Sequence, residues 1–453
     1  MKYTEASSTM DRRDFIKSAG AGAAAFGLAA CTNNKSVTVD TKLGEMTYRT
    51  NPNSGDKTSL LGYGTMRWQM IKNADGKDVI DQDSVNELVD RAIEAGINYF
   101  DSSPVYLQGQ SEQATGLALA RHPRNSYFIA TKLSNFSNWT KENSILMYKK
   151  SLENFQTDYL DYYLLHAVSG EAVFRQRFVD NGMMEYLMEE RKAGRIRNLG
   201  FSFHGPASGF DEMMKYHEQY HWDFVQIQMN YSDWTHQTRE AKAQYMYEEL
   251  TKRGIPVVIM EPLLGGALAQ VPDAIAKRFM EREPSRSIAS WAFRFCGTHP
   301  NVLVTLSGMT YREHLEDNLK SFCPLVPLTE EELEFLESQA SLMKEYPTIS
   351  CTGCKYCMPC PYGIDIPTIF AHYNKCVNEG NVVDLENATP EQKEFRKARR
   401  AYLISYDRAL EKVRQADHCV GCEECMSHCP QHIRIPRELQ RIDRYVNNLK
   451  KTF

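Results

Sequence analysis

The sequence has little net charge and lacks any apolar run long enough to cross a membrane. Its 453 residues carry 53 lysines and arginines against 58 aspartates and glutamates, which leaves a net charge of -5. That balance gives no reason to expect nucleic acid or an anionic membrane surface as a partner. A transmembrane helix needs about 20 consecutive apolar residues, and no segment supplies them. We therefore expect a globular protein.

The chain is too long for one ordinary domain, and it has room for a barrel of about 250 residues and a smaller module. Hydrophobic residues make up 42% and charged residues 25%, as in globular proteins. Four segments are expected from the patterns described below. They are an export signal at 1–31, a polar linker at 32–45, a barrel at 46–345 and a cysteine-containing domain at 346–453.

An export signal is predicted at the N-terminus. Arg12 and Arg13 precede a weakly apolar stretch of small residues that ends at Cys31 and is too short to span a bilayer. A buried alanine-rich helix is the alternative. The two arginines and the final Leu-Ala-Ala-Cys resemble a twin-arginine signal with a lipobox. The resemblance implies export of a folded protein to the periplasmic side, with membrane contact only through a lipid anchor on Cys31.

Eight short β-rich runs alternate with longer amphipathic stretches after the linker. This order predicts parallel strands joined by crossover helices, and eight such units predict a TIM (β/α)8 barrel, here followed by a small α-helical ferredoxin-like domain. A doubly wound sheet is the alternative, but the segment GYGTM does not supply its Gly-rich first turn. The runs begin at Ser59, Asn98, Tyr127, Tyr159, Ile196, Phe224, Pro256 and Val302.

Four titratable side chains follow or end three consecutive runs. Asp101 ends the second run and Tyr106 follows five residues later, while Lys132 and His166 end the third and fourth. Strand ends meet at one rim of a TIM barrel, where the chemistry takes place. The set suits proton transfer to a carbonyl oxygen: Lys132, held by Asp101, would lower the pKa of the Tyr106 phenol. His166 would hydrogen-bond the substrate oxygen and pass a proton to Tyr106.

The segments FDSSPVY, ATKL and LLHA resemble the Asp-Tyr-Lys-His tetrad of the aldo/keto reductases. GYGTM, GRIRNLGFS and GMTYREHLEDNL extend the resemblance over about Met46 to Val326. It implies an NAD(P)H-dependent oxidoreductase that transfers hydride to or from a small carbonyl or alcohol substrate. By this resemblance Tyr106 is the general acid, His166 polarises the carbonyl, and Asp101 with Lys132 tunes Tyr106.

The same resemblance implies a set of cofactor contacts at the strand ends. The nicotinamide amide should meet Ser202 and Gln226, and Met260 stands where many relatives carry a stacking aromatic. Arg312 is the expected partner of a 2′-phosphate, so NADP(H) and NAD(H) both stay open. The full set is Gly64, Thr65, Met66, Ser202, Gln226, Met260, Leu263, Gly265, Ser307, Gly308, Met309, Arg312 and Asn318.

Eight of the twelve cysteines fall in two runs, CTGCKYCMPCP and CVGCEECMSHCP. The second has the C-x2-C-x2-C-x3-C-P spacing in which three thiolates bind one [4Fe-4S] cube and the fourth reaches another. Disulfides and zinc are the alternatives, but adjacent CxxC pairs do not readily pair with each other, and zinc gives no reason for a third cysteine in each run. Two [4Fe-4S] clusters with crossed ligation are predicted, one on Cys351, Cys354, Cys357 and Cys429, and the other on Cys419, Cys422, Cys425 and Cys360.

Fused to this barrel, the cysteine runs resemble the iron-sulfur branch of the aldo/keto reductases. Hydride carries two electrons and a cluster takes one at a time, and no flavin signature is present to split the pair. One hypothesis is a carbonyl reductase or alcohol dehydrogenase whose clusters recycle a bound cofactor or serve a redox partner protein. A second is an electron-transfer protein with a non-catalytic barrel, and a third gives the clusters a structural role alone.

Overall fold

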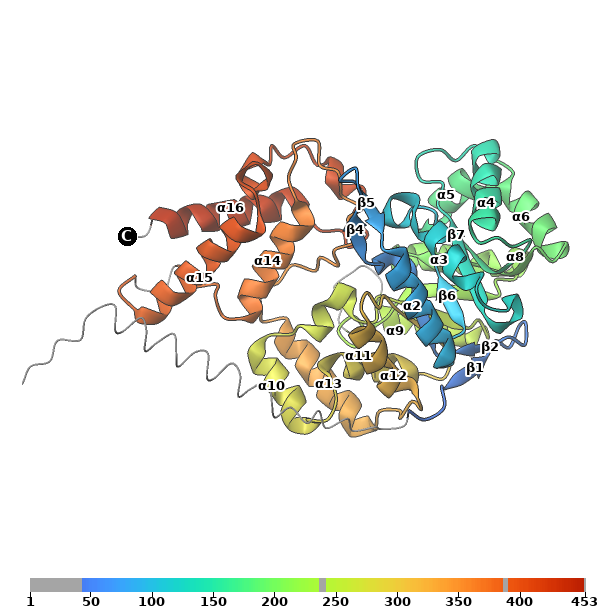
Figure 1. Ribbon diagram of the computed structural model, residues 1–453, viewed down its shortest axis with the longest axis horizontal. Coiled ribbons are helices and arrows are strands. Elements are labelled where there is room, and N and C mark those ends of the chain that lie inside the picture. The colour runs from blue at the N-terminus through green and yellow to red at the C-terminus, as the bar shows by residue number, and fades with distance from the viewer. Residues whose placement is uncertain (1–42, 236–241, 386–389, 452–453) are drawn as a thin grey trace, which may run out of the picture. The chain divides into compact units, whose positions relative to one another are not determined.

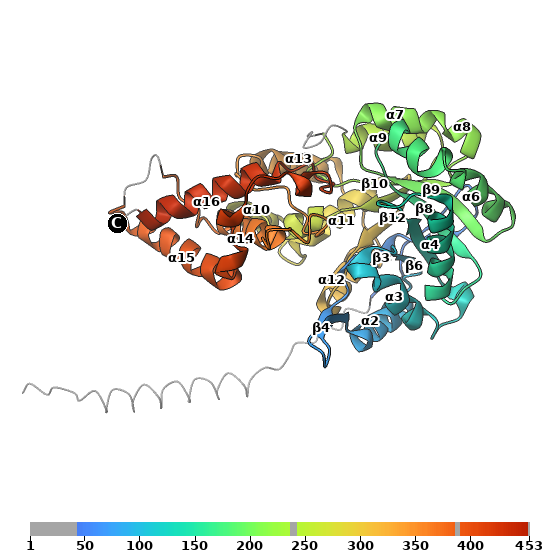
Figure 2. The same ribbon diagram turned by 90° about the horizontal axis from the view of Figure 1, so that it is seen from above.

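The structure is a computed structural model that describes residues 43–235, 242–385 and 390–451. The export signal expected at Arg12, Arg13 and Cys31, with most of the linker, lies outside the described residues. Gly44–Phe453 forms one compact unit, in which a barrel is followed by a helical region (Figure 1 and Figure 2). Within the described part of the chain, no helix combines the length and apolar character needed to cross a membrane.

Eight parallel strands close into a barrel, and they are the eight runs predicted from the sequence. Each strand pairs with the next one along the barrel, and the last returns to the first through the pairs Thr305–Leu61 and Ser307–Tyr63. All C-terminal strand ends therefore lie at one rim. The strands are β3 (Leu61–Gly64), β6 (Tyr99–Asp101), β7 (Phe128–Leu133), β8 (Leu160–Val168), β9 (Ile196–Phe203), β10 (Phe224–Gln228), β11 (Val257–Met260) and β12 (Val302–Ser307).

Aromatic and branched aliphatic side chains fill the barrel interior. The ring of Tyr162 lies edge-to-face with Tyr99 and with Phe224, each at a centroid distance of 5.0 Å. Leu164 and Val304 belong to the same buried cluster. Because the interior is packed with side chains, the strand ends are left as the place for a binding site.

Two short antiparallel hairpins lie outside the barrel, and no pattern in the sequence predicts them. One pairs β1 (Tyr48–Thr50) with β2 (Lys57–Ser59), ahead of the first barrel strand. The other pairs β4 (Met70–Lys72) with β5 (Asp78–Ile80), in the loop after that strand. Each strand has only three residues, which is too short for an alternation of apolar and polar residues to be recognised in the sequence.

Helices connect the strands and surround the barrel (Figure 2). In α2 the Asp81 side chain caps the first turn by accepting from the Ser84 amide, and Val85 and Leu88 lie on its buried face. The barrel helices are α2 (Gln82–Glu94), α3 (Ser111–Leu119), α4 (Lys141–Asn154), α5 (Glu171–Phe174), α6 (Met183–Lys192), α7 (Ala207–Lys215), α8 (His217–Tyr220), α9 (Ala243–Lys252), α10 (Asp273–Arg282), α11 (Ile288–Thr298), α12 (Arg312–Phe322) and α13 (Glu330–Met343).

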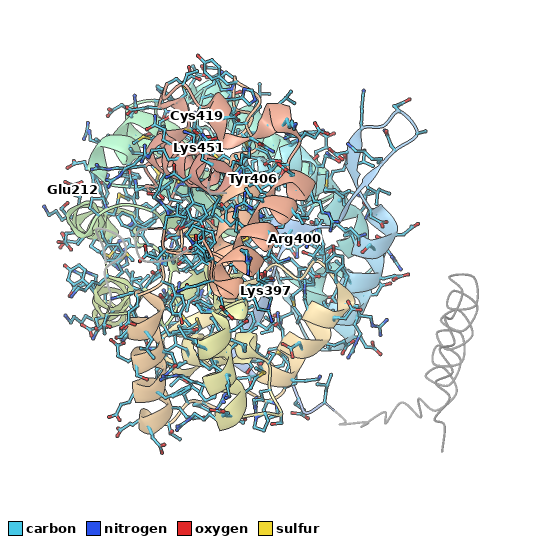
Figure 3. All side chains as sticks on the ribbon, turned by 90° about the vertical axis from the view of Figure 1, so that its left-hand side faces the viewer. Glu212, Lys397, Arg400, Tyr406, Cys419 and Lys451 are labelled. Carbon is cyan, nitrogen blue, oxygen red and sulfur yellow. The ribbon has the colours of Figure 1, made fainter. Side chains whose placement is uncertain are left out.

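Three helices and the two cysteine loops make up the C-terminal region, so the predicted α-helical domain is confirmed. The helices are α14 (Ile366–Asn378), α15 (Lys393–Ala409) and α16 (Ile435–Lys451). They share a buried core that includes Phe370, Tyr402 and Ile442, and cysteines of both loops pack against it. Lys397 and Arg400 lie exposed on α15 (Figure 3).

Gly116 gives a test of the barrel packing. A Cβ at this position would lie 2.0 Å from the carbonyl oxygen of Asn154 at the end of α4. Gly to Ala inside a helix ordinarily stabilises by about 1 kcal/mol, whereas overpacking costs about 1–3 kcal/mol. We expect Gly116→Ala to lower the thermal unfolding midpoint. The neighbouring Leu117, which is 45% exposed, supplies the control: equal effects of Gly116→Ala and Leu117→Ala would contradict the packing account.

Candidate functional site

The structure brings the four predicted catalytic residues together at the C-terminal rim of the barrel. Lys132 Nζ donates hydrogen bonds to Asp101 Oδ1 at 2.6 Å and to the Ser102 carbonyl oxygen at 2.7 Å. The same ammonium nitrogen lies 5.0 Å from the centroid of the Tyr106 ring. The rings of Tyr106 and His166 are edge-to-face with centroids 6.1 Å apart. A half-buried phenol thus lies beside a buried imidazole and a buried ion pair.

His166 is held by residues that the sequence pattern did not indicate. Its Nδ1 lies 2.5 Å from Ser134 Oγ, and Arg177 Nη1 donates to its carbonyl oxygen at 2.8 Å. Burial, with the charge of Lys132 next in effect, holds the pKa of His166 well below its ordinary value, so the ring is neutral. A Ser134 hydroxyl that donates to Nδ1 leaves the ring proton on Nε2, where it can be donated to a substrate oxygen.

The pKa of Tyr106 differs from the expectation. Burial raises it well above the ordinary value of a phenol, and Tyr356 from the first cysteine run is the next largest cause. The ammonium of Lys132 is hydrogen-bonded to Asp101 rather than to the Tyr106 phenol. The prediction that Lys132 lowers this pKa is therefore wrong for this structure, because desolvation dominates. Tyr106 keeps its proton at neutral pH.

The residues expected to meet nicotinamide lie on β9 and β10. Ser202 Oγ accepts a hydrogen bond from the Ala167 amide at 2.8 Å. Gln226 is buried, and its Oε1 has no hydrogen-bond partner among the residues that the structure describes. A buried amide oxygen normally has a donor, and the amide group of nicotinamide would supply one. The chemistry of these side chains therefore fits the expected cofactor.

The other predicted cofactor residues lie at the ends of β3, β11 and β12 and on α12. Asn318 Nδ2 donates to Ser307 Oγ at 2.9 Å, which ties α12 to the end of β12. The exposed guanidinium of Arg312 lies 3.5 Å from Glu316, so any anion would share it with that carboxylate. The residues are Gly64, Thr65 and Met66 after β3, Met260, Leu263 and Gly265 at β11, and Ser307, Gly308, Met309, Arg312 and Asn318 at β12 and α12.

The first cysteine run lies against this same rim. Arg67 Nη2 donates to the carbonyl oxygens of Thr352, at 2.6 Å, and Gly265, at 3.4 Å. Burial raises the pKa of Tyr356, and the charges of Cys354, Glu261 and Asp101 add to that rise. Sequence reasoning missed the contact between Arg67 and Thr352, because the two residues are 285 positions apart and no local pattern joins them.

The eight thiols of the two runs fall into two groups. Burial and, after it, the neighbouring thiols of its group raise the pKa of Cys357 to about 12. Burial, together with the thiols of its own group, raises the pKa of Cys425 to about 11. Crowded thiols of this kind become thiolates when metal supplies positive charge. The groups are Cys351, Cys354, Cys357 and Cys429, and Cys360, Cys419, Cys422 and Cys425.

The thiols of the second group line a cavity of about 220 Å³ between the two cysteine loops. Within the described ranges, no three His, Cys, Asp or Glu side chains lie close enough to share a single metal ion. A cube takes each thiolate on a different iron, so its ligands lie farther apart than those of one zinc. The cavity and the four thiols that line it fit an iron-sulfur cluster.

Comparison with known proteins identifies both parts of the chain. The model of the aldo/keto reductase family matches residues 60–340, more than half of the sequence. The chain belongs to the aldo/keto reductase family. It is accordingly an oxidoreductase, and a second model, described as a 4Fe-4S dicluster domain, matches residues 350–434. The reductase thus carries a ferredoxin-type iron-sulfur domain after its barrel.

Relatives of the reductase resemble its barrel. The oxidoreductase YqkF of Bacillus subtilis is 26% identical over 55% of this chain and 86% of its own length. The methylglyoxal reductase DkgB of Salmonella typhi is 36% identical over 26% of this chain, a segment that spans only 43% of that relative. Among solved structures, an aldo-keto reductase of Bacillus halodurans in its holo form matches 65% of this chain and 96% of its own, at 23% identity and a TM-score of 0.53. That likeness shows the barrel fold.

Proposed function

We propose that the protein reduces a small carbonyl compound with NADPH or NADH, and that its C-terminal domain holds two [4Fe-4S] clusters. The observation that carries the proposal is the corner formed by Tyr106, His166 and the Lys132–Asp101 pair. The Tyr106 phenol holds its proton at neutral pH, and the neutral imidazole of His166 can donate a second hydrogen bond, so both can stabilise negative charge that develops on a carbonyl oxygen. The reverse reaction would need the phenolate, which burial disfavours.

Each residue has a defined role in this reaction. When bound, nicotinamide would supply the hydride. His166 orients the substrate oxygen by donating a hydrogen bond from Nε2, and Tyr106 donates its proton to that oxygen as negative charge develops there. The Lys132–Asp101 pair keeps Tyr106 in place and provides a positive charge 5.0 Å from the centre of its ring. Gln226 orients the nicotinamide amide through its unpartnered Oε1.

The comparisons support the cofactor and the substrate class. A similar aldo-keto reductase from Klebsiella pneumoniae, 21% identical with a TM-score of 0.51, was solved in complex with NADPH. DkgB is named for methylglyoxal, a small carbonyl compound. Arg312 at the start of α12 is the cation that a 2′-phosphate would meet, which favours NADPH over NADH.

The clusters are proposed to exchange electrons with a redox partner protein. Cys429 is among the thiols that raise the pKa of Cys357, and Cys360 is among those that raise the pKa of Cys425, which supports the crossed ligation of a two-cluster ferredoxin. Lys397 and Arg400 line a groove between α14 and α15 whose lining contains no acidic residue. The groove therefore suits an acidic partner.

We also propose that the reductase is exported by the twin-arginine route and anchored by a lipid on Cys31. The motif at Arg12 and Arg13 motivates this, and a cluster-containing protein suits a route that carries folded cargo. No diffusible nicotinamide pool is expected outside the cytoplasm, so the cofactor would travel bound to the barrel.

Tyr106→Phe tests the catalytic role. Removing the proton donor should lower carbonyl reduction by about 10²–10⁴-fold and leave NADPH binding unchanged. Turnover over a panel of small aldehydes and NADPH binding by calorimetry measure the two effects. Tyr245→Phe is the control, because that phenol donates to Asp211 at 2.6 Å on the outside of the barrel. Full activity in Tyr106→Phe would favour an electron-transfer protein with a non-catalytic barrel.

Single cysteine variants test the cluster assignment. Anaerobically purified protein should contain about eight iron and eight sulfide per chain. Cys354→Ala and Cys425→Ala should each lose about half of both, because they belong to different groups. Cys376→Ala is the control, since Cys376 is buried in α14 beside His372. Zinc in place of iron, or equal losses in all three variants, would contradict the assignment.

A further inference from the structure

The first cysteine loop is seated on the barrel through Thr352. A Cβ built on Gly265 would lie 2.3 Å from Thr352 Cα and 2.6 Å from the Thr352 carbonyl oxygen. Arg67 Nη2 donates to that same oxygen at 2.6 Å. The chain of Arg67 also lies against Gly308, whose Cβ would come 3.0 Å from Arg67 Cδ. Thr352 is therefore fixed by the loops after β3 and β11, and through Arg67 by the loop after β12.

Tyr356 belongs to the same loop. Thr352 is buried and Tyr356 follows it by four residues, between Cys354 and Cys357. Tyr356 lines the cavity between the two cysteine loops. The contact of Thr352 with the barrel therefore joins the cluster-binding region to the barrel rim.

We propose that the loop 351–361 is a wall of the nucleotide site. Thr352 is the positioning residue that holds the loop over the nucleotide. This inference rests on the proposed function, because it assumes that the nucleotide lies at Gly265 and Gly308. It predicts that the nucleotide leaves only when the contact between Thr352 and Gly265 opens, which would retain the cofactor in an exported enzyme.

Two adjacent glycines allow the effect of losing this contact to be distinguished from the effect of backbone strain in the loop. Gly265 and Gly266 both have positive φ, at 67° and 103°, so alanine strains the backbone at either position. A Cβ on Gly265 meets the backbone of Thr352, whereas a Cβ on Gly266 has no atom within 4 Å. Gly266→Ala is therefore the matched control for Gly265→Ala.

Exchange of bound radiolabelled NADP⁺ against unlabelled NADP⁺ tests the positioning contact in the full-length holoprotein. Gly265→Ala and Arg67→Ala should both speed exchange by about tenfold or more, while Gly266→Ala should stay close to the wild type. Iron and sulfide counts equal to the wild type show that the clusters are intact. Equal exchange rates in Gly265→Ala and Gly266→Ala would overturn the inference and leave the proposed function standing. A wild type that binds no NADP⁺ would overturn both.

Discussion

The buried ion pair between Lys132 and Asp101 is the interaction on which the active site depends. Both side chains are almost fully buried, and their charged atoms lie 2.6 Å apart. Desolvation of two charges is expensive, so such a pair persists only with close geometry and further hydrogen bonds, and the Ser102 carbonyl supplies one. Adjacent parallel strands β6 and β7 provide the two residues. The barrel register therefore decides whether the pair can form.

Burial also determines how the neighbouring groups titrate. A water-exposed Lys–Tyr pair would favour the phenolate, but here desolvation raises the pKa of Tyr106 and the ammonium of Lys132 is paired with Asp101. His166 stays neutral for the same reason. The site is thus arranged to hold protons until a developing oxyanion takes them.

Local patterns in the sequence were sufficient to predict the barrel and to show that the catalytic motifs lie at the ends of its strands. Eight β-rich runs are visible one by one, and strand ends such as Lys132 and His166 can be located without tertiary information. The spacing of the cysteines likewise indicates their chemistry. The direction of a pKa shift could not be predicted in this way, because the burial of Tyr106 arises only in the folded molecule. The contacts of Ser134, Thr352 and Tyr356 also join distant segments, and no local signal marks them.

The central claim is that a cluster and the nucleotide occupy neighbouring positions at one barrel rim. Electron paramagnetic resonance of the chemically reduced protein, recorded with and without NADP⁺, tests it most directly. The account predicts that NADP⁺ changes the g values or relaxation of the cluster bound by Cys351, Cys354 and Cys357, while the other cluster signal stays the same. Identical spectra with NADP⁺ bound would contradict the claim.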